Sequence, residues 1–243
     1  MTVYKLTTKE WATNVVVKAF TSWILRVEAS QLGKLPPTGP LIVITNHINF
    51  LEAPAIYTRM MPRPVTAFSK VETWDSKFLG WLFDVWGIIP IRRGEADKKA
   101  LKAGLQALKD NYILTISPEG TRSGNGVLQR GLPGIVMMAL LSGAPIIPVA
   151  HHGHEFYQEN LRRLRRSDFK VAVGNPFYLE KGSEKVTSEI RQQMIDEMMY
   201  QLAVLLPEEY RGVYANFSQA TEKYLRFELP AESNLIGLKL NRE

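Results

Sequence analysis

One histidine and one acid are spaced so that they could act together as a general base. His47 follows an apolar run and precedes Glu52 by five positions. An imidazole takes up a proton near neutral pH, and a carboxylate on its other ring nitrogen fixes the tautomer and stabilises the imidazolium that forms. Residues five apart on an ideal helix point roughly 140° away from each other. We therefore predict that His47 lies in a turn ahead of a helix that carries Glu52.

Four segments in order resemble the motif blocks of the glycerolipid acyltransferase family. They are NHINFLE at residues 46–52, GIIPIRR at 87–93, SPEGTRS at 117–123 and GAPIIPV at 143–149. The order and spacing of the four blocks carry the resemblance. It is strongest to bacterial 1-acylglycerol-3-phosphate acyltransferases, which transfer a fatty acyl chain from acyl-CoA or acyl carrier protein to lysophosphatidic acid.

The resemblance implies an O-acyltransferase that produces phosphatidic acid in phospholipid biosynthesis. His47 would remove the proton from the acceptor hydroxyl as it attacks the thioester, while Glu52 orients the ring. The thioester is already activated, so no metal and no cofactor besides the acyl donor is expected. The family usually has Asp at the position of Glu52 and often Ser at that of Asn49. These differences keep another lysophospholipid or lipid alcohol open as the acceptor. A separate alternative is a non-catalytic lipid-binding module of the same fold.

The second and third blocks supply groups that suit the acceptor phosphate. The resemblance places the phosphate-contacting arginine at Arg93. A guanidinium can donate two parallel hydrogen bonds to a phosphate, and backbone N–H groups in a tight turn add an anion-binding concavity. The competing interpretation is that the arginines of these two blocks only cap strands and pair with acids. The predicted substrate-binding residues are Arg92, Arg93, Glu119, Gly120, Thr121 and Arg122.

Composition narrows the classes of partner. The chain has 243 residues, no cysteine and a formal net charge of +6, so a cysteine nucleophile, disulfides and thiolate metal sites are excluded. The basic balance favours an anionic partner such as a phospholipid surface or a nucleic acid. The densest basic cluster, at residues 162–166, lacks flanking exposed aromatics. It is expected to be a solvated helix end or a contact with anionic lipid, and no nucleic acid partner is expected.

The N-terminal segment has the pattern of an amphipathic helix. Thr7 and Glu10 form a capping-box pattern, and Gly33 followed by two prolines marks a stop, which predicts a helical region of roughly 25 residues. Tryptophans and basic residues on one such segment suit the headgroup region of a bilayer. The alternative is a helix packed over the core. We predict a membrane-associating segment at 1–35 and a catalytic domain at 36–243, held peripherally or monotopically on the cytoplasmic face of the cell membrane.

The remaining sequence alternates between apolar strands and helical patterns. Strand-like runs such as LIVIT, YILTI and PIIPVA are separated by helix-length segments. Continuous apolar strands between helices indicate an α/β fold with a mixed, largely parallel sheet flanked by helices, as in glycerol-phosphate acyltransferases. Ligands in such folds collect beyond the carboxyl ends of the parallel strands. The motif blocks lie at or near these predicted ends, so we expect one site there.

Three more histidines, at positions 151, 152 and 154, raise the possibility of zinc. Neighbouring residues on a strand point to opposite faces, so His151 and His152 are poorly placed to share a metal. We therefore predict a polar loop at a strand end near the active cleft, and no metal. A methionine-rich stripe in a long helix over about 183–206 is expected to be core packing.

Overall fold

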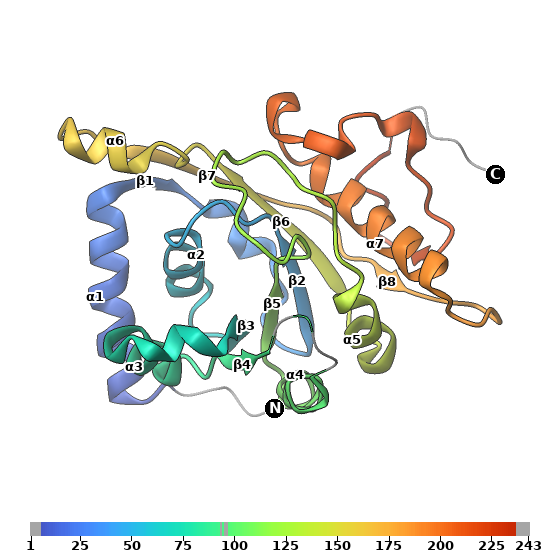
Figure 1. The fold of residues 1–243 in the computed structure, drawn as a ribbon, viewed down its shortest axis with the longest axis horizontal. Helices are drawn as coiled ribbons and strands as arrows, with labels where there is room; N and C mark the ends of the chain where they lie inside the picture. Colours follow the sequence, from blue (N-terminus) through green and yellow to red (C-terminus); the bar gives the residue numbers. More distant parts are fainter. Residues whose placement is uncertain (1–5, 93, 95–96, 237–243) are drawn as a thin grey trace.

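The computed structural model describes residues 6–92, 94 and 97–236. A seven-stranded sheet runs through the molecule in the order β1-β7-β6-β2-β5-β3-β4 (Figure 1). The strands of this sheet are β1 (Leu25–Glu28), β2 (Leu41–Thr45), β3 (Val65–Lys70), β4 (Ile89–Ile91), β5 (Ile113–Ile116), β6 (Ile146–His152) and β7 (Ser167–Val173). Among the described strands, β6 and β7 form the one antiparallel pair of this sheet. The predicted mixed, largely parallel α/β fold is confirmed.

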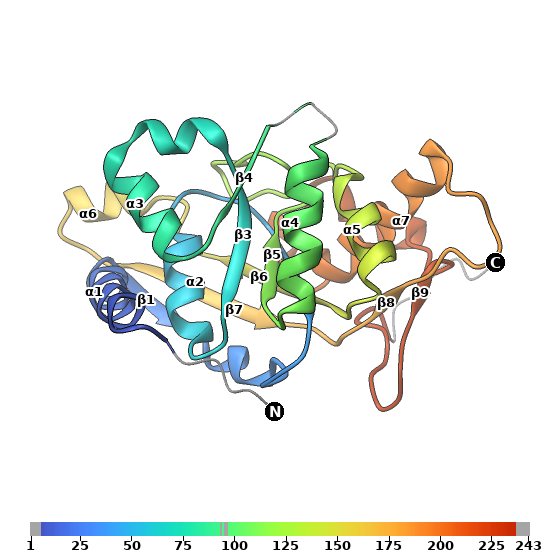
Figure 2. The same ribbon diagram turned by 90° about the horizontal axis from the view of Figure 1, so that it is seen from below.

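Helices cover both faces of the sheet. They are α1 (Thr8–Ile24), α2 (Glu52–Met60), α3 (Lys77–Val85), α4 (Lys98–Lys109), α5 (Gly134–Ser142), α6 (Tyr157–Arg162) and α7 (Ser188–Ala203). Figures 1 and 2 show α1, α2 and α3 on one side of the sheet and α4, α5 and α7 on the other. A two-stranded sheet of β8 (Tyr178–Leu179) and β9 (Leu225–Arg226) lies beside α7.

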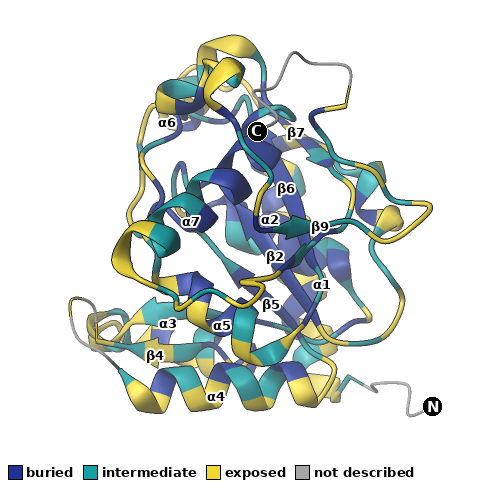
Figure 3. Cartoon of the chain, turned by 90° about the vertical axis from the view of Figure 1, so that its right-hand side faces the viewer, coloured by how far each residue is buried: buried dark blue, intermediate teal, exposed yellow. Residues whose placement is uncertain are grey.

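Alternate residues of the central strands feed two separate cores. On β2, Ile42 and Ile44 pack towards α5 and α7, whereas Leu41 and Val43 pack towards α1, α2 and α3. This is the period-2 alternation of a strand that is buried on both faces. Figure 3 shows the buried strands between helices whose outer surfaces are exposed. The site beyond the ends of these strands is therefore supported by packed side chains on both faces of the sheet.

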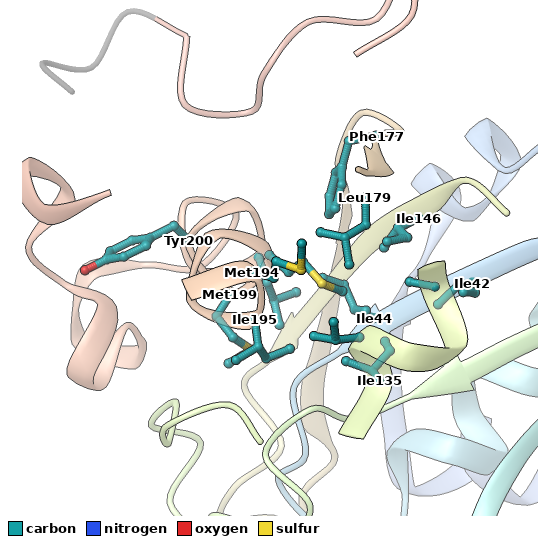
Figure 4. Packing of buried hydrophobic residues seen from close by; sticks show 14 of the residues in the cluster. Ile42, Ile44, Ile135, Ile146, Phe177, Leu179, Met194, Ile195, Met199 and Tyr200 are labelled. Carbon is teal, nitrogen blue, oxygen red and sulfur yellow. The ribbon is translucent and has the colours of Figure 1, made fainter. Parts of the chain in front are cut away.

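Helix α7 closes the first core with the predicted methionine stripe. Met194 and Met198 are fully buried, and Ile190 packs on the same cluster. Figure 4 shows Met194, Ile195 and Met199 directed at the apolar strand residues. The helix is shorter than the predicted span of 183–206. It begins at Ser188 because Thr187 accepts a hydrogen bond from the N–H of Ile190 and fixes the first turn, and it ends at Ala203.

The N-terminal segment departs from the predicted helical region of roughly 25 residues, which could have been one helix or two. Thr7 and Glu10 do form the capping box, but α1 ends at Ile24. Residues 25–28 form strand β1, which pairs in parallel with β7, and Arg26 Nε donates to Asp168 Oδ1 at 2.6 Å. The expectation of helix across this stretch was wrong, since pairing with a strand more than 140 positions away in sequence outweighs the local helical pattern. The division at residue 35 stays a prediction.

Candidate active site

His47 and Glu52 form the pair that the spacing predicts. His47 lies in the turn between β2 and α2, and Glu52 is the first residue of α2. The carboxylate oxygen Oε1 of Glu52 contacts His47 Nδ1. The His47 side chain is 22% exposed, while that of Glu52 is only 4% exposed. Because an ionised carboxylate can only accept, Nδ1 carries the proton, and the unprotonated Nε2 is left to act as a base.

The second oxygen of Glu52 is also fully engaged. Oε2 accepts from the backbone N–H of Asn49 at 2.8 Å and lies 3.3 Å from His154 Nε2. Burial alone would raise the pKa of the Glu52 carboxyl. The hydrogen bonds from His154 and His47, with the nearby His151, more than offset that cost and hold this pKa well below its usual range. Glu52 is therefore ionised at neutral pH.

Asn46 joins β2 to β6 directly behind the catalytic turn. Its side chain accepts from the N–H of His151 at 2.9 Å and donates to the carbonyl oxygen of the same residue at 2.8 Å. His151 Nε2 in turn lies 2.9 Å from the Asn46 carbonyl oxygen. Burial lowers the pKa of His151 to about 3, so this ring is neutral. Asn46 thus serves as a structural clamp that fixes where the turn begins.

Glu119, from the third block, supports the backbone of His47. Its Oε1 accepts from the N–H of His47 at 2.7 Å, and its Oε2 accepts from the N–H of Gln129 at 2.9 Å. The side chain is buried. The sequence suggests that Glu119 orients an arginine or the substrate, but both carboxylate oxygens bind backbone groups instead. Its predicted contact with substrate stays a prediction.

The turn after Glu119 has the predicted tight geometry. Gly120 has a φ of +69°, a backbone conformation that residues with a side chain rarely adopt, so glycine is favoured here. Its N–H donates to Ser117 O at 3.1 Å, which closes the turn. Thr121 and Arg122 are exposed. The following N–H groups return to the catalytic turn, since Ser123 N donates to His47 O at 2.8 Å. The first and third blocks therefore lie side by side.

The second block sits at the far edge of the sheet. Arg92 follows β4, is exposed, and donates its backbone N–H to Asp97 Oδ2 at 3.1 Å. Arg93, the predicted phosphate contact, lies outside the described residues. The phosphate role of both arginines therefore stays a prediction.

Two of the three later histidines belong to the site, although the sequence did not assign them a role there. His151 and His154 are fully buried, whereas His152 is half-buried and its ring lies 5.1 Å from that of Tyr210. The prediction that the side chains of His151 and His152 point to opposite faces of the strand is thus confirmed. Within the described part of the chain, Glu52, His151 and His154 are the one group whose ligand atoms are spaced closely enough for a metal ion. Glu52 is already bound by His47, Asn49 and His154, so the geometry favours a hydrogen-bonded cluster.

Glu119 should make the free energy of unfolding depend on pH. Burial raises its pKa to about 7 from 4.5, so the folded state keeps a proton that the unfolded state loses between these values. The Glu119 contribution to the free energy of unfolding is full below pH 4.5 and falls as pH rises to about 7, by up to about 3 kcal/mol. In Glu119→Gln this dependence should vanish. Urea unfolding of both proteins at several pH values measures the difference, and parallel stability curves would contradict the expectation.

Comparisons with known proteins agree with this geometry. A family model described as Acyltransferase matches residues 26–152. The chain is 25% identical over 179 residues to 1-acyl-sn-glycerol-3-phosphate acyltransferase BAT2, chloroplastic, of Brassica napus, covering 71% of this chain and 51% of that one. It is 33% identical over 116 residues to the lyso-ornithine lipid O-acyltransferase of Pseudomonas aeruginosa, covering 47% and 43%. The chain therefore spans about half the length of these relatives.

A solved structure supports the same assignment at the level of fold. The crystal structure of the LPA acyltransferase PlsC from Thermotoga maritima superposes with a TM-score of 0.54 at 18% identity, covering 77% of this chain and 75% of that one. The matched family region begins within β1 and ends at His152, so it contains His47, Glu52 and the turn at Gly120. With more than half of its residues matched by the family model, this chain belongs to the Acyltransferase family.

Proposed function

We propose that this protein transfers a fatty acyl group from an acyl thioester to the free hydroxyl of lysophosphatidic acid, which gives phosphatidic acid. The observation that carries the proposal is the His47–Glu52 pair, in which Nδ1 of a partly exposed ring is held by a buried carboxylate and Nε2 is left unprotonated. In the reaction, Nε2 removes the acceptor proton as the hydroxyl oxygen attacks the thioester carbonyl. Glu52 stabilises the imidazolium, and the thiolate leaves.

A thiol-release assay tests this function directly. The purified protein would be given acyl-CoA, or acyl carrier protein loaded with the same acyl chain, together with lysophosphatidic acid. Acceptor-dependent thiol release with formation of phosphatidic acid supports the proposal. Release that does not depend on any acceptor would indicate a thioesterase, and no turnover with any donor and acceptor would support a non-catalytic lipid-binding module.

A second acceptor class has a specific observation in its favour. The relative with 33% identity is named a lyso-ornithine lipid O-acyltransferase, and its matched segment covers 47% of this chain. The chemistry at His47 would be the same, because that acceptor also has to present a nucleophilic hydroxyl. Including lyso-ornithine lipid and a neutral lysolipid among the acceptors separates the two possibilities by their kcat/KM values.

Arg122 should discriminate between phosphate-bearing and neutral acceptors. It is exposed beside the turn that contacts the His47 backbone, and a hydrogen bond from a charged group contributes about 1.5 to 3 kcal/mol. We expect Arg122→Ala to raise KM for lysophosphatidic acid about tenfold or more, with little change for a neutral acceptor. Arg130→Ala, another exposed arginine on the same segment, should affect both acceptors alike. Equal losses on the two acceptors in Arg122→Ala would make Arg122 structural.

We also propose that the protein binds an anionic membrane surface through α1 and α3. Helix α1 is docked with its polar side inwards: Asn14 accepts from Trp86 Nε1 at 2.9 Å, and Arg59 donates to Ser22 at 2.7 Å. The apolar side faces outwards. The exposed apolar residues of the α1–α3 patch are Trp11, Val15, Val16, Phe20, Trp23, Phe78, Leu79 and Trp81. An exposed apolar surface of this kind is typical of a membrane contact.

Basic residues border the α1–α3 patch. Arg166 donates to the carbonyl oxygens of Ser22 and Leu25, both at 2.6 Å, which places the start of β7 next to the end of α1. Arg162, Arg163 and Arg165 nearby are exposed and would favour anionic headgroups. No helix in the described part of the chain is both long and apolar enough to cross a bilayer. A peripheral position on the cytoplasmic face is the form of association that we propose.

Removing the aromatic part of the patch should release the protein from vesicles. Burying a large apolar side chain contributes about 1.5 to 3 kcal/mol, so replacing Trp11, Phe20 and Trp23 together by Ser should move the protein from the pellet to the supernatant. The measurement is sedimentation with anionic liposomes.

A matched control uses exposed apolar residues of the C-terminal segment, whose ribbon lies beside α7, across the sheet from α1 (Figure 1). Replacing Val213, Leu229 and Ile236, which are 62%, 92% and 59% exposed, by Ser should leave liposome binding unchanged. If the α1 variant still sediments like the wild type, or if both triple variants lose binding equally, the α1–α3 patch is not the contact surface.

A further inference from the structure

His154 is the buried group that the reaction scheme leaves unused. It lies two positions beyond β6, is 0% exposed, and packs against Phe169 with 4.6 Å between ring centroids. Its Nε2 lies 3.3 Å from Glu52 Oε2. Since Glu52 is ionised and can only accept, His154 must present an N–H at Nε2. The Glu52 carboxylate therefore lies between two imidazoles, with Oε1 at His47 and Oε2 at His154.

The loop that carries His154 is fixed from the same catalytic turn. Asn49 Nδ2 donates to the His154 carbonyl oxygen at 3.2 Å, and the N–H of Asn49 donates to Glu52 Oε2 at 2.8 Å. Asn49 Oδ1 accepts from Leu51 N at 2.9 Å, which holds the side chain in this orientation. Asn49 thus contacts both His154 and Glu52.

These contacts involve the two positions where the chain differs from the usual motif. A serine at 49 would lack the amide that donates to the His154 carbonyl. An aspartate at 52 is one methylene shorter, so from the same backbone position its carboxylate would be drawn back from both His47 Nδ1 and His154 Nε2. The glutamate and the asparagine are therefore matched to the buried histidine.

We propose that His154 is a positioning residue of this enzyme, which holds Glu52 through an Nε2–H hydrogen bond so that the other carboxylate oxygen orients His47. The chain thus contains an ordered His154–Glu52–His47 array in which only His47 meets the substrate. This inference rests on the proposed acyl transfer for its kinetic consequences. Its structural part, the tautomer of His154 and its bond to Glu52, is independent of any activity.

The kinetic test is a set of variants with thermal unfolding measured in parallel. His154→Phe keeps a ring but removes the donor, and we expect kcat to fall about tenfold to a hundredfold with KM little changed, as for loss of a hydrogen bond to a charged group. His154→Gln can place an amide N–H near the position of Nε2 and should recover kcat to within about threefold of wild type. His152→Phe, on the adjacent residue that faces Tyr210, is the matched control and should keep kcat within about twofold.

A double-mutant cycle shows whether His154 acts through Glu52. Because the shorter side chain of Glu52→Asp cannot reach both imidazoles, His154→Phe should cost much less kcat in that background than in the wild type. Equal costs in the two backgrounds would overturn the proposal. So would a folded His154→Phe enzyme with wild-type kcat, or a Gln variant no better than Phe.

Histidine NMR keeps the proposal testable if the Phe variant fails to fold or if the wild type has no acyltransferase activity. In wild-type protein labelled with ¹⁵N-histidine, His154 should be the Nε2–H tautomer, and Glu52→Gln should shift its Nε2–H resonance. An Nδ1–H tautomer, or a resonance that is unchanged in Glu52→Gln, would overturn the proposal. Absence of turnover in the wild type with a correct His154 signal would instead contradict the proposed function alone.

Discussion

Replacing His47 by alanine should abolish measurable acyl transfer while the protein stays folded. Loss of a general base lowers the rate by about 10² to 10⁴, and the two other histidines of the described residues that lie nearest to Glu52 are not placed to substitute. His151 and His154 are fully buried, so neither can reach an acceptor hydroxyl. The measurement is kcat for acyl-CoA and lysophosphatidic acid.

The structural control for this variant is thermal unfolding. The His47 side chain is partly exposed, and its backbone N–H, which donates to Glu119, is retained in alanine. The protein should therefore stay folded, with a lower melting temperature because the buried Glu52 carboxylate loses its bond to His47. Turnover within about threefold of the wild type, in a folded variant, would show that His47 is not the base.

Replacing Glu52 by glutamine should cost orders of magnitude in kcat. The neutral amide cannot stabilise the imidazolium, and its NH₂ group can select the wrong tautomer of His47. The buried site adds to the cost, because with the amide oxygen at Asn49 N and His154 Nε2 the NH₂ group would face the Nδ1–H of His47, donor against donor. Measuring kcat from pH 6 to 8 covers the range in which an imidazole titrates.

The Glu52→Asp variant distinguishes the effect of the negative charge at position 52 from the effect of side-chain length. It keeps the carboxylate, so it should retain activity well above that of Glu52→Gln, but below the wild type because the shorter side chain loses part of the hydrogen-bond set. If Glu52→Gln were as active as the wild type across this pH range, Glu52 would serve only as the acid at the start of α2, even with His47 essential.

The pair at His47 and Glu52 was predictable because it depends on local geometry. Five positions separate the two residues, and the need for a turn before a helix follows from helical periodicity alone. The alternating strand and helix patterns likewise give the sheet and place the motif blocks near the ends of strands. The buried methionines of α7 follow from the same kind of local argument.

The rest of the site depends on contacts between distant parts of the chain. His154 reaches Glu52 across 102 positions, and Glu119 reaches the His47 backbone across 72. The histidines were visible in the sequence, but alternation along a strand gives only the face on which each lies, not its partner. Strand β1 was missed for the same reason, since its four residues are strand only because β7 is beside them.

The orientation of α1 was also beyond what periodicity can decide. The apolar stripe predicts an amphipathic helix equally well whether that stripe is buried or exposed. The structure buries Thr13, Asn14 and Thr21 instead, because Trp86 and Arg59 provide hydrogen-bonding partners for this side of the helix. Those partners lie on α2 and directly after α3, and they leave no signal in the N-terminal segment.

The two backbone bonds to Glu119 have a mechanical consequence. One carboxylate connects the peptide of His47 to the segment after the exposed turn, so we expect a displacement of one part of the site to displace the other. An acceptor that displaces the turn on binding should then also displace His47 Nε2 from the position in which it takes up the hydroxyl proton. Poor acceptors should therefore show a lower kcat as well as a higher KM. Recognition of the headgroup would then affect how readily the proton is removed, and not only how tightly the acceptor binds.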